Sequence, residues 1–149
     1  MENIFNATLI CIKSGADMAK AKELMREKRI RHLPVVDHNN NITGILSAHD
    51  LTDVVKFQDL PVDLFASAPV KHVSPDTLLS EIALRMVAEK VSCLIISENG
   101  KAAGIITTDD LLYELSTLLK EKEKNASPGI YGALTTVGEL CKKLADIGI

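Results

Sequence analysis

Two short stretches, GILSAHD at 44–50 and GIITTDD at 104–110, each place an aspartate three positions after a hydroxyl residue. A hydroxyl at the start of a helix lies beside unpaired backbone N–H groups, which readily donate hydrogen bonds to a phosphate. An ionised carboxylate one turn later can accept hydrogen bonds from both hydroxyls of a ribose. Ser47, Asp50, Thr107 and Asp110 are therefore candidate ligand-binding residues.

The same Ser/Thr-x-x-Asp spacing is also a variant of the capping box, in which the acid accepts from the backbone N–H of the cap residue. It occurs a third time at Ser14–Asp17, where no ligand is expected. What favours binding at the other two is their location, because each follows a glycine-led strand. Capping and ligand binding both remain open, and one residue can do both.

An internal repeat organises the chain. Residues 21–37 align with residues 82–98 at an offset of 61, so that Met25 matches Met86 and Leu33 matches Leu94. After the next turn the offset becomes 60, and Gly44 matches Gly104. A length change at a surface turn, with the register kept on both sides, indicates two copies of one folded unit.

The residue pattern of the first copy predicts the element order strand, helix, strand, turn, strand, helix. The strands are expected at Thr8–Lys13, Arg31–Asp37 and Ile42–Ser47. Apolar residues at helical spacing predict a helix after Ser14–Asp17 that runs to about Lys28, and a second helix from near Ala48 to about Phe57. Asparagines at 39–41 predict the turn, because Asn tolerates left-handed backbone.

The second copy repeats this order. Ser74 is expected to cap a helix with Pro75 at its first position. The strands are Ser92–Ser97 and Ala102–Thr107, joined by an Asn-Gly turn, and the last helix is expected from about Asp109 to Leu119. The expected buried stripe of the first of these two helices consists of Leu78, Leu79, Ile82, Met86 and Val87.

The predicted fold class is therefore α/β (α+β), with two β-α-β-β-α repeats packed about a pseudo-twofold axis, because one copy alone buries too little apolar surface. The expected boundaries are 1–57 for the first domain, 58–69 for a connector, 70–119 for the second domain, and 120–149 for a charged linker and a short amphipathic helix. That helix could pack on its own domain pair, on another subunit or on a separate partner.

Composition excludes several functions. Apolar residues make up 46% of the chain and aromatic residues 3%, with no Trp, so the core is expected to be aliphatic. The net charge of −3 and the lack of aromatic platforms argue against nucleic-acid binding. No apolar run reaches the ~18 residues of a membrane span, and no signal peptide is evident. Three dispersed cysteines indicate reduced thiols of a cytoplasmic protein.

No catalytic or metal-binding constellation is apparent. The four histidines lack the spacing of metal ligands, and no Walker loop or activated cysteine occurs. Ser47, His49 and Asp50 lie within one turn and cannot converge as a catalytic triad, which needs separate segments. An enzyme is therefore the least favoured class.

The ordered pattern resembles a CBS domain, named after cystathionine β-synthase. Residues 30–37 (IRHLPVVD) followed by residues 44–50 carry the resemblance in the first copy, and residues 91–98 followed by 104–110 carry it in the second. The resemblance covers roughly residues 5–119. It implies a disc-like pair of domains that commonly forms homodimers.

The resemblance also implies an adenosine-containing ligand, such as AMP, ADP, ATP or S-adenosylmethionine, in clefts between the repeats. It assigns phosphate contacts to Ser47 and Thr107 and ribose contacts to Asp50 and Asp110. Such proteins often place a cation beside the LPVV strand, which here gives Arg31 and His32. His49 and Asp109, next to the motif aspartates, are further candidate nucleotide contacts.

The two copies differ in charge, because Ser92 and Cys93 stand where the first copy has Arg31 and His32. The cleft that faces Arg31 and His32 is therefore expected to bind an anionic nucleotide better, unless these two are an ordinary surface arginine and strand histidine. The favoured function is a ligand-sensing regulatory module with no obligatory cofactor, acting on a protein that the sequence does not identify. The alternative is a structural or oligomerising module with empty clefts.

Overall fold

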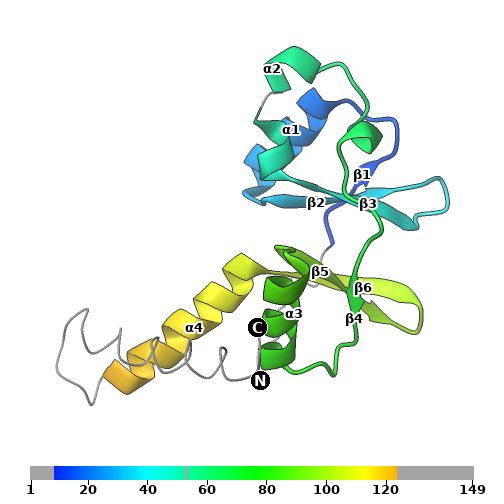
Figure 1. Ribbon diagram of the computed structural model, residues 1–149. Coiled ribbons are helices and arrows are strands. Elements are labelled where there is room, and N and C mark those ends of the chain that lie inside the picture. Colours follow the sequence, from blue (N-terminus) through cyan, green and yellow to red (C-terminus); the bar gives the residue numbers. More distant parts are fainter. Residues whose placement is uncertain (1–8, 53, 124–149) are drawn as a thin grey trace. The chain divides into compact units, whose positions relative to one another are not determined.

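The computed structural model describes residues 9–52 and 54–123 (Figure 1). They form two compact units. The first comprises the described parts of 3–77 and 93–106, and the second those of 78–92 and 107–149. The first unit holds the two three-stranded sheets up to Ile106, and the second holds two long helices. Within the described residues, no helix is long and apolar enough to cross a membrane.

The first sheet has the strand order β1-β2-β3, with β1 at Ile12–Lys13, β2 at His32–Val36 and β3 at Ile42–Ser47. β1 runs parallel to β2, and the helix α1 (Met18–Lys28) makes the crossover between them. β2 runs antiparallel to β3. α1 and β3 match the predicted bounds, whereas β1 is shorter than the predicted strand, and residues 9–11 precede it without strand pairing.

The predicted single helix after β3 is wrong, because two short helices replace it. A 3₁₀ turn, η1, spans Ala48–Leu51, and α2 spans Val54–Phe57. The backbone N–H of Thr52 donates to the carbonyl of His49 at 3.2 Å, and the Thr52 hydroxyl donates to the same carbonyl. Both bonds reach three residues back, which is the 3₁₀ and not the α-helical pattern.

The second sheet has the order β4-β5-β6, with β4 at His72–Val73, β5 at Cys93–Glu98 and β6 at Lys101–Thr107. β4 runs parallel to β5. The predicted Asn-Gly turn joins β5 and β6, and both of its residues have positive φ, 51° at Asn99 and 76° at Gly100. This is the backbone that a two-residue hairpin turn requires.

The predicted helix start at Ser74 is wrong. Helix α3 spans Leu79–Glu89, and its N-cap is Leu78, which offers no side-chain bond. Ser74 instead closes a turn, because its carbonyl accepts from the N–H of Thr77 at 3.1 Å and its hydroxyl accepts from the N–H of Asp76 at 3.3 Å. The Ser-Pro pair therefore ends β4 and does not open the helix.

The buried face of α3 is narrower than predicted. Ile82 and Met86 are buried, whereas Leu78 and Val87 remain 69% and 61% exposed. Helix α4 starts at Thr108 and runs to Glu123, four residues beyond the predicted end at Leu119. The extension consists of alternating Lys and Glu, which have high helix propensity. The predicted amphipathic helix near the C-terminus lies outside the described residues.

The core is aliphatic, as the composition predicted. A buried cluster in the first repeat joins α1 to its sheet and to the turn η2 (Val62–Leu64). It consists of Ile12, Met18, Ala21, Met25, Leu33, Val35, Leu46, Leu51 and Val62. In the second repeat, the buried strand residues are Val73, Leu94, Ile95, Ile96 and Ile106.

The two copies end their first long helix identically. Arg29 and Lys90 are the C-caps of α1 and α3, with φ of 54° and 52°. The next residue in each copy, Ile30 or Val91, returns its N–H to the carbonyl of the matching methionine at 3.0 Å. This left-handed cap is a common helix end. Its recurrence at the predicted offset supports the repeat assignment at the level of backbone conformation.

The connector folds onto the first repeat. Ser67 exchanges two backbone hydrogen bonds with Ile45 of β3, at 3.0 Å and 2.8 Å. Asp63, in the 3₁₀ turn η2 (Val62–Leu64), accepts from the Ser14 hydroxyl and the Gly15 N–H, both at 2.7 Å. These two donors lower the pKa of Asp63, because they stabilise its ionised form.

Candidate functional site

The first motif lies where β3 ends and η1 begins. The backbone N–H and the hydroxyl of Ser47 both donate to Oδ2 of Asp50, at 2.7 Å each. The N–H of Ala48 donates to the carbonyl of Arg31 at 2.7 Å, which ties η1 to the start of β2. Asp50 is half-buried, so its carboxylate is oriented by these bonds and remains within reach of solvent.

The second motif, at the end of β6, repeats this geometry. The N–H and the hydroxyl of Thr107 both donate to Oδ2 of Asp110 at 2.7 Å. In addition, the N–H of Asp110 donates to the Thr107 hydroxyl oxygen at 3.3 Å. The N–H of Thr108 donates to the carbonyl of Ser92 at 3.0 Å, which matches the Ala48–Arg31 bond of the first copy.

Capping therefore takes one oxygen of each aspartate. Among the described residues, Oδ1 of Asp50 and Oδ1 of Asp110 have no hydrogen-bond partner. A carboxylate oxygen in this state can accept from a ribose hydroxyl while the cap persists. The hydroxyls of Ser47 and Thr107 differ in this respect, because their protons point to the carboxylate. A phosphate contact by either hydroxyl would require the proton to turn away from the cap.

The third Ser-x-x-Asp sequence folds differently. Ser14 donates to Asp63, and Asp17 itself is the N-cap of α1, accepting from the N–H of Lys20 at 2.7 Å. The same spacing thus gives an ordinary side-chain cap here and a serine-to-aspartate or threonine-to-aspartate pair at the two strand ends. Both candidate sites lie at the end of a glycine-containing second hairpin strand, β3 or β6, whereas Ser14 follows the short strand β1; this location, not the spacing, distinguishes them.

The structure brings the basic candidates of the first copy to this corner. His32 opens β2 and pairs with Ser47 across the ladder, and the exposed Arg31 precedes it. His49 is exposed on η1, between Ser47 and Asp50 in the chain. These five predicted site residues therefore come from the start of β2 and from the end of β3 with its following turn.

The matching corner of the second copy carries no such cation on its strand. Ser92 and Cys93 occupy the positions of Arg31 and His32, and Asp109 is exposed beside Asp110. Burial raises the pKa of the Cys93 thiol to about 11, so this side chain is neutral near pH 7. The two copies therefore differ in charge at the start of the first strand of each hairpin, β2 or β5.

Gly44 serves packing, not ligand approach. A Cβ at this position would lie 2.9 Å from Cβ of Ala66 and 3.3 Å from the carbonyl oxygen of Ser67. The glycine that introduces the first motif thus lets the connector lie against β3. Sequence reasoning did not find this role, because Ala66 and Gly44 are not near each other in the chain.

Two repeats of β-α-β-β-α with a hydroxyl–aspartate pair after the last strand of each define a class of tandem two-domain proteins. A family model described as CBS domain matches the chain twice, at residues 2–56 and 62–117. The chain therefore belongs to the CBS-domain family. The resemblance and the expected α/β class with two β-α-β-β-α repeats are confirmed.

Curated relatives match over about three quarters of the chain. A homoserine O-acetyltransferase of Methanococcus vannielii is 27% identical over 116 residues, which cover 74% of this chain and 24% of that protein. The chain thus spans about a quarter of the acetyltransferase. An uncharacterized 17.7 kDa protein of Acidianus ambivalens is 28% identical, with 74% of this chain and 70% of that protein covered.

Solved structures support the same fold. The putative acetoin utilization protein AcuB of Vibrio cholerae is 28% identical, with a TM-score of 0.68 and coverage of 85% of this chain and 96% of that one. The CBS domain pair of protein MJ0100, solved with 5′-methylthioadenosine and S-adenosyl-L-methionine, has a TM-score of 0.70 at 19% identity. There the match covers 77% of this chain and 94% of that one.

Proposed function

We propose that this chain is a regulatory module that binds an adenosine-containing nucleotide of the AMP, ADP or ATP type at its hydroxyl–aspartate pairs. The observation that carries the proposal is that Oδ1 of Asp50 and of Asp110, in two equivalent capped carboxylates, has no hydrogen-bond partner within residues 9–52 and 54–123. Each carboxylate is held in place by its cap and still has an oxygen for a ribose hydroxyl. Preorganised acceptors of this kind reduce the entropy that binding costs.

Family membership supports a ligand of this class. The CBS domain pair of MJ0100 was solved with two adenosine compounds, one of them S-adenosyl-L-methionine. S-adenosylmethionine therefore remains a second candidate ligand for this chain. The proposed preference for an anionic nucleotide in the first copy depends on Arg31 and His32, which lie next to Ser47 along the ladder and in the chain.

The proposed mode of action is regulation and not catalysis. A bound nucleotide shifts an equilibrium between two conformations only by its differential affinity for them. The shift would act on a homodimer or on a separate target protein in the cytoplasm. A homodimer is supported by apolar side chains that α3 and α4 leave exposed, among them Val87 at 61%, Leu112 at 61% and Tyr113 at 75%.

The domain boundaries 1–57, 58–69, 70–119 and 120–149 belong to this proposal. The acetyltransferase activity named for the longer relatives is not assigned to this chain, because the match covers about a quarter of their length. If the matched quarter of those relatives is a regulatory module attached to other domains, it corresponds to most of this chain.

Thermal unfolding with AMP, ADP, ATP, S-adenosylmethionine and NAD tests the proposal. A ligand at a hundred times its Kd should stabilise the chain by about 2.7 kcal/mol. The matched control is the double variant Asp50→Asn with Asp110→Asn, which should unfold like the wild type without ligand and lose the ligand-induced shift. A shift with none of the five compounds contradicts nucleotide sensing.

The alternative is a structural module without a ligand. The specific observation in its favour is that both hydroxyl protons of the motifs are used by the caps. In that case the two aspartates would only stabilise helix starts. The thermal panel separates the alternatives, because a structural module gains nothing from any of the compounds.

A further inference from the structure

A cavity of about 650 Å³ lies at the turn ends of the two hairpins, within the first compact unit. Its walls come from β1 and the turn between β2 and β3, and from β4 and the turn between β5 and β6. This volume is within the range of small-molecule sites, which is about 300–1,000 Å³. None of the hydroxyl–aspartate residues Ser47, Asp50, Thr107 and Asp110 lines it.

The polar lining of this cavity carries one sign of charge. Lys13, Lys101 and His72 contribute cationic or ionisable nitrogens, and asparagines 39–41 contribute amides, whereas none of the lining residues is an aspartate or glutamate. The ammonium of Lys13 donates to Oδ1 of Asn40, and Nδ1 of His72 lies 2.7 Å from the Ser97 hydroxyl. These contacts hold a lysine and a histidine at the cavity wall.

The carboxylate of Asp37, which follows the lining residue Val36, is already used by the turn. Asp37 accepts from the N–H groups of Asn39 and Asn41, both at 2.8 Å, and from the Asn41 amide at 3.1 Å. These donors lower the pKa of Asp37, so it is ionised at neutral pH and shapes the turn. The rest of the lining is apolar and includes Leu9, Val36 and Ile42.

The cavity lies at the opposite end of the strands from the hydroxyl–aspartate pairs. In the first sheet, Ser47 pairs with His32 at the start of β2, whereas Ile42 pairs with Val36 at its end. In the second, Lys101 opens β6 and Thr107 closes it. At ~3.3 Å per residue, five or six residues of strand separate cavity and motif by roughly 15–20 Å along each strand.

We propose that this cavity binds a small molecule with an oxyanion group, phosphate or carboxylate, on an apolar body. Lys13 and Lys101 pair with the oxyanion as point charges, and the asparagine amides donate to it. Leu9, Val36 and Ile42 cover the apolar part. The site is separate from the proposed nucleotide contacts and does not depend on them.

The test uses the full chain labelled with ¹⁵N and three matched probes: phenyl phosphate, benzoate and benzyl alcohol. Both anions should shift the amide signals of residues 39–41 and Gly100 saturably, and the neutral alcohol should bind at least about tenfold more weakly. The tighter of the two anions identifies the preferred headgroup. Equal binding of the alcohol, or no shift of these signals by either anion, overturns the proposal.

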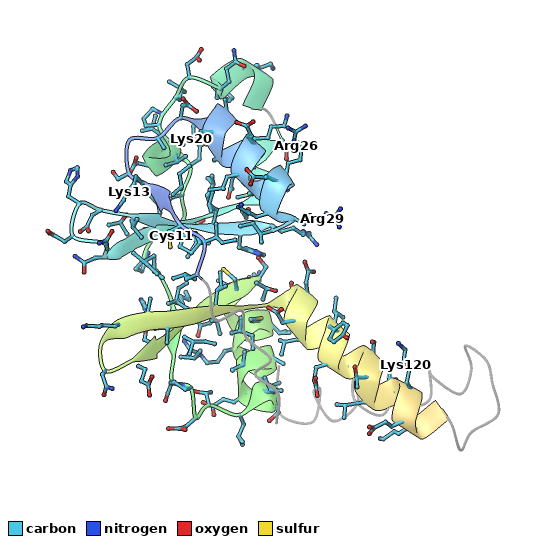
Figure 2. The ribbon with its side chains drawn as sticks, turned by 180° about the vertical axis from the view of Figure 1, so that it is seen from behind. Cys11, Lys13, Lys20, Arg26, Arg29 and Lys120 are labelled. Atoms are coloured by element: carbon cyan, nitrogen blue, oxygen red, sulfur yellow. The ribbon has the colours of Figure 1, made fainter. Side chains whose placement is uncertain are left out.

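Variants locate the contact. Lys13→Met and Lys101→Met should each weaken binding of the tighter anion by about tenfold. Lys20→Met is the control, because Lys20 lies on α1 and apart from Lys13 (Figure 2). Since Lys13 and Lys101 are exposed, both variants should fold, and the amide spectrum checks this. Unchanged affinity in both variants contradicts the site.

Titration with AMP distinguishes this cavity from the proposed nucleotide site. Binding of AMP with shifts near Ser47 or Thr107, and none at the cavity, keeps the two sites distinct. Shifts by AMP at residues 39–41 would place the nucleotide in the cavity and overturn the separateness of the two sites. Asp50→Asn should leave phenyl phosphate binding unchanged, so failure of the nucleotide proposal does not affect this one.

Discussion

Ser47 and Asp50 are joined by two hydrogen bonds that end on the same carboxylate oxygen, each 2.7 Å long. Thr107 and Asp110 are joined in the same way. One oxygen of each aspartate therefore stabilises the start of a helical turn, and the other faces no described partner. Capping and the proposed ribose contact use different oxygens of one side chain, and substitution can separate the two roles.

Asp50→Asn should lower nucleotide affinity by about tenfold while the free energy of unfolding changes by less than about 0.5 kcal/mol. The amide oxygen can replace Oδ2 in the cap, but the amide nitrogen cannot accept from a ribose hydroxyl. Asp50→Ala should lose both functions and cost about 0.5–2 kcal/mol. Calorimetric titration and denaturant unfolding measure the two quantities.

Asp17→Asn is the matched control for that experiment, because Asp17 caps α1 and is not a proposed ligand contact. Its affinity for nucleotide should equal that of the wild type. If Asp50→Asn and Asp110→Asn also retain full affinity, the two motifs are caps only.

Gly44→Ala should destabilise the chain by about 1–3 kcal/mol, because the new Cβ would lie 2.9 Å from Cβ of Ala66. Ala66→Gly removes that contact, so the double variant should recover part of the loss. Denaturant unfolding of the two single variants and the double variant gives the coupling. Additive losses would show that Ala66 is not the residue that requires a glycine.

Asp63→Asn should lower stability at neutral pH by up to about 1 kcal/mol, since Asp63 is largely exposed. The folded pKa of Asp63 is lowered by the Gly15 N–H and the Ser14 hydroxyl. Its stabilising contribution is therefore fully present above the unfolded pKa, about 3.9, and is lost as the pH falls through the lower folded value. The difference between wild type and variant should shrink as the pH falls below about 4.

Thermal unfolding between pH 3 and pH 7 measures this difference. A constant difference across the range would mean that the charge of Asp63 is not what stabilises the connector.

The Cys93 thiol should react with iodoacetamide at pH 8 about a hundredfold more slowly in the folded chain than in the unfolded one. Burial raises its pKa to about 11, and the thiolate is the reactive form. Mass spectrometry of the digested protein resolves each cysteine separately. Labelling at the same rate in both states would contradict a half-buried, neutral thiol.

Leu112→Glu on α4 and Val87→Lys on α3 should convert the proposed homodimer to a monomer, because a charge in an apolar interface leaves it buried and unpaired. Light scattering with size-exclusion chromatography measures the mass. Leu64→Glu is the control, since Leu64 is 67% exposed in the connector. A wild-type monomer, or a dimer that all three variants retain, argues against this interface.

Local patterns predicted much of the fold. The helical spacing of Met18, Ala21 and Met25 predicted α1 with its observed end at Lys28, and the run at Ile42–Ser47 after the asparagine turn predicted β3. The Asn-Gly turn could be predicted from the backbone preference of its two residues alone. These features depend on residues close in the chain, which is the information that a sequence pattern contains.

The errors came from contacts that the pattern does not contain. Ser74 has the chemistry of a helix cap, but it closes a turn, and only the path of the chain beyond it distinguishes the two. The residues of the hydroxyl–aspartate pairs were predictable. That both donors would bond Oδ2 and leave Oδ1 without a described partner was not. Lys13, His72 and Lys101 line one cavity because the turns of the two hairpins lie close together. The spacing of these residues in the sequence does not predict this.

The backbone exchange between Ser67 and Ile45 has a consequence for aggregation. β3 is an edge strand of the first sheet, and an open edge presents N–H and C=O groups to which another chain can add a strand. Ser67 occupies both groups of Ile45 in the middle of that edge. The segment around Ser67 thus also shields the first sheet from intermolecular strand addition, and a chain cut before Ser67 would lose that protection.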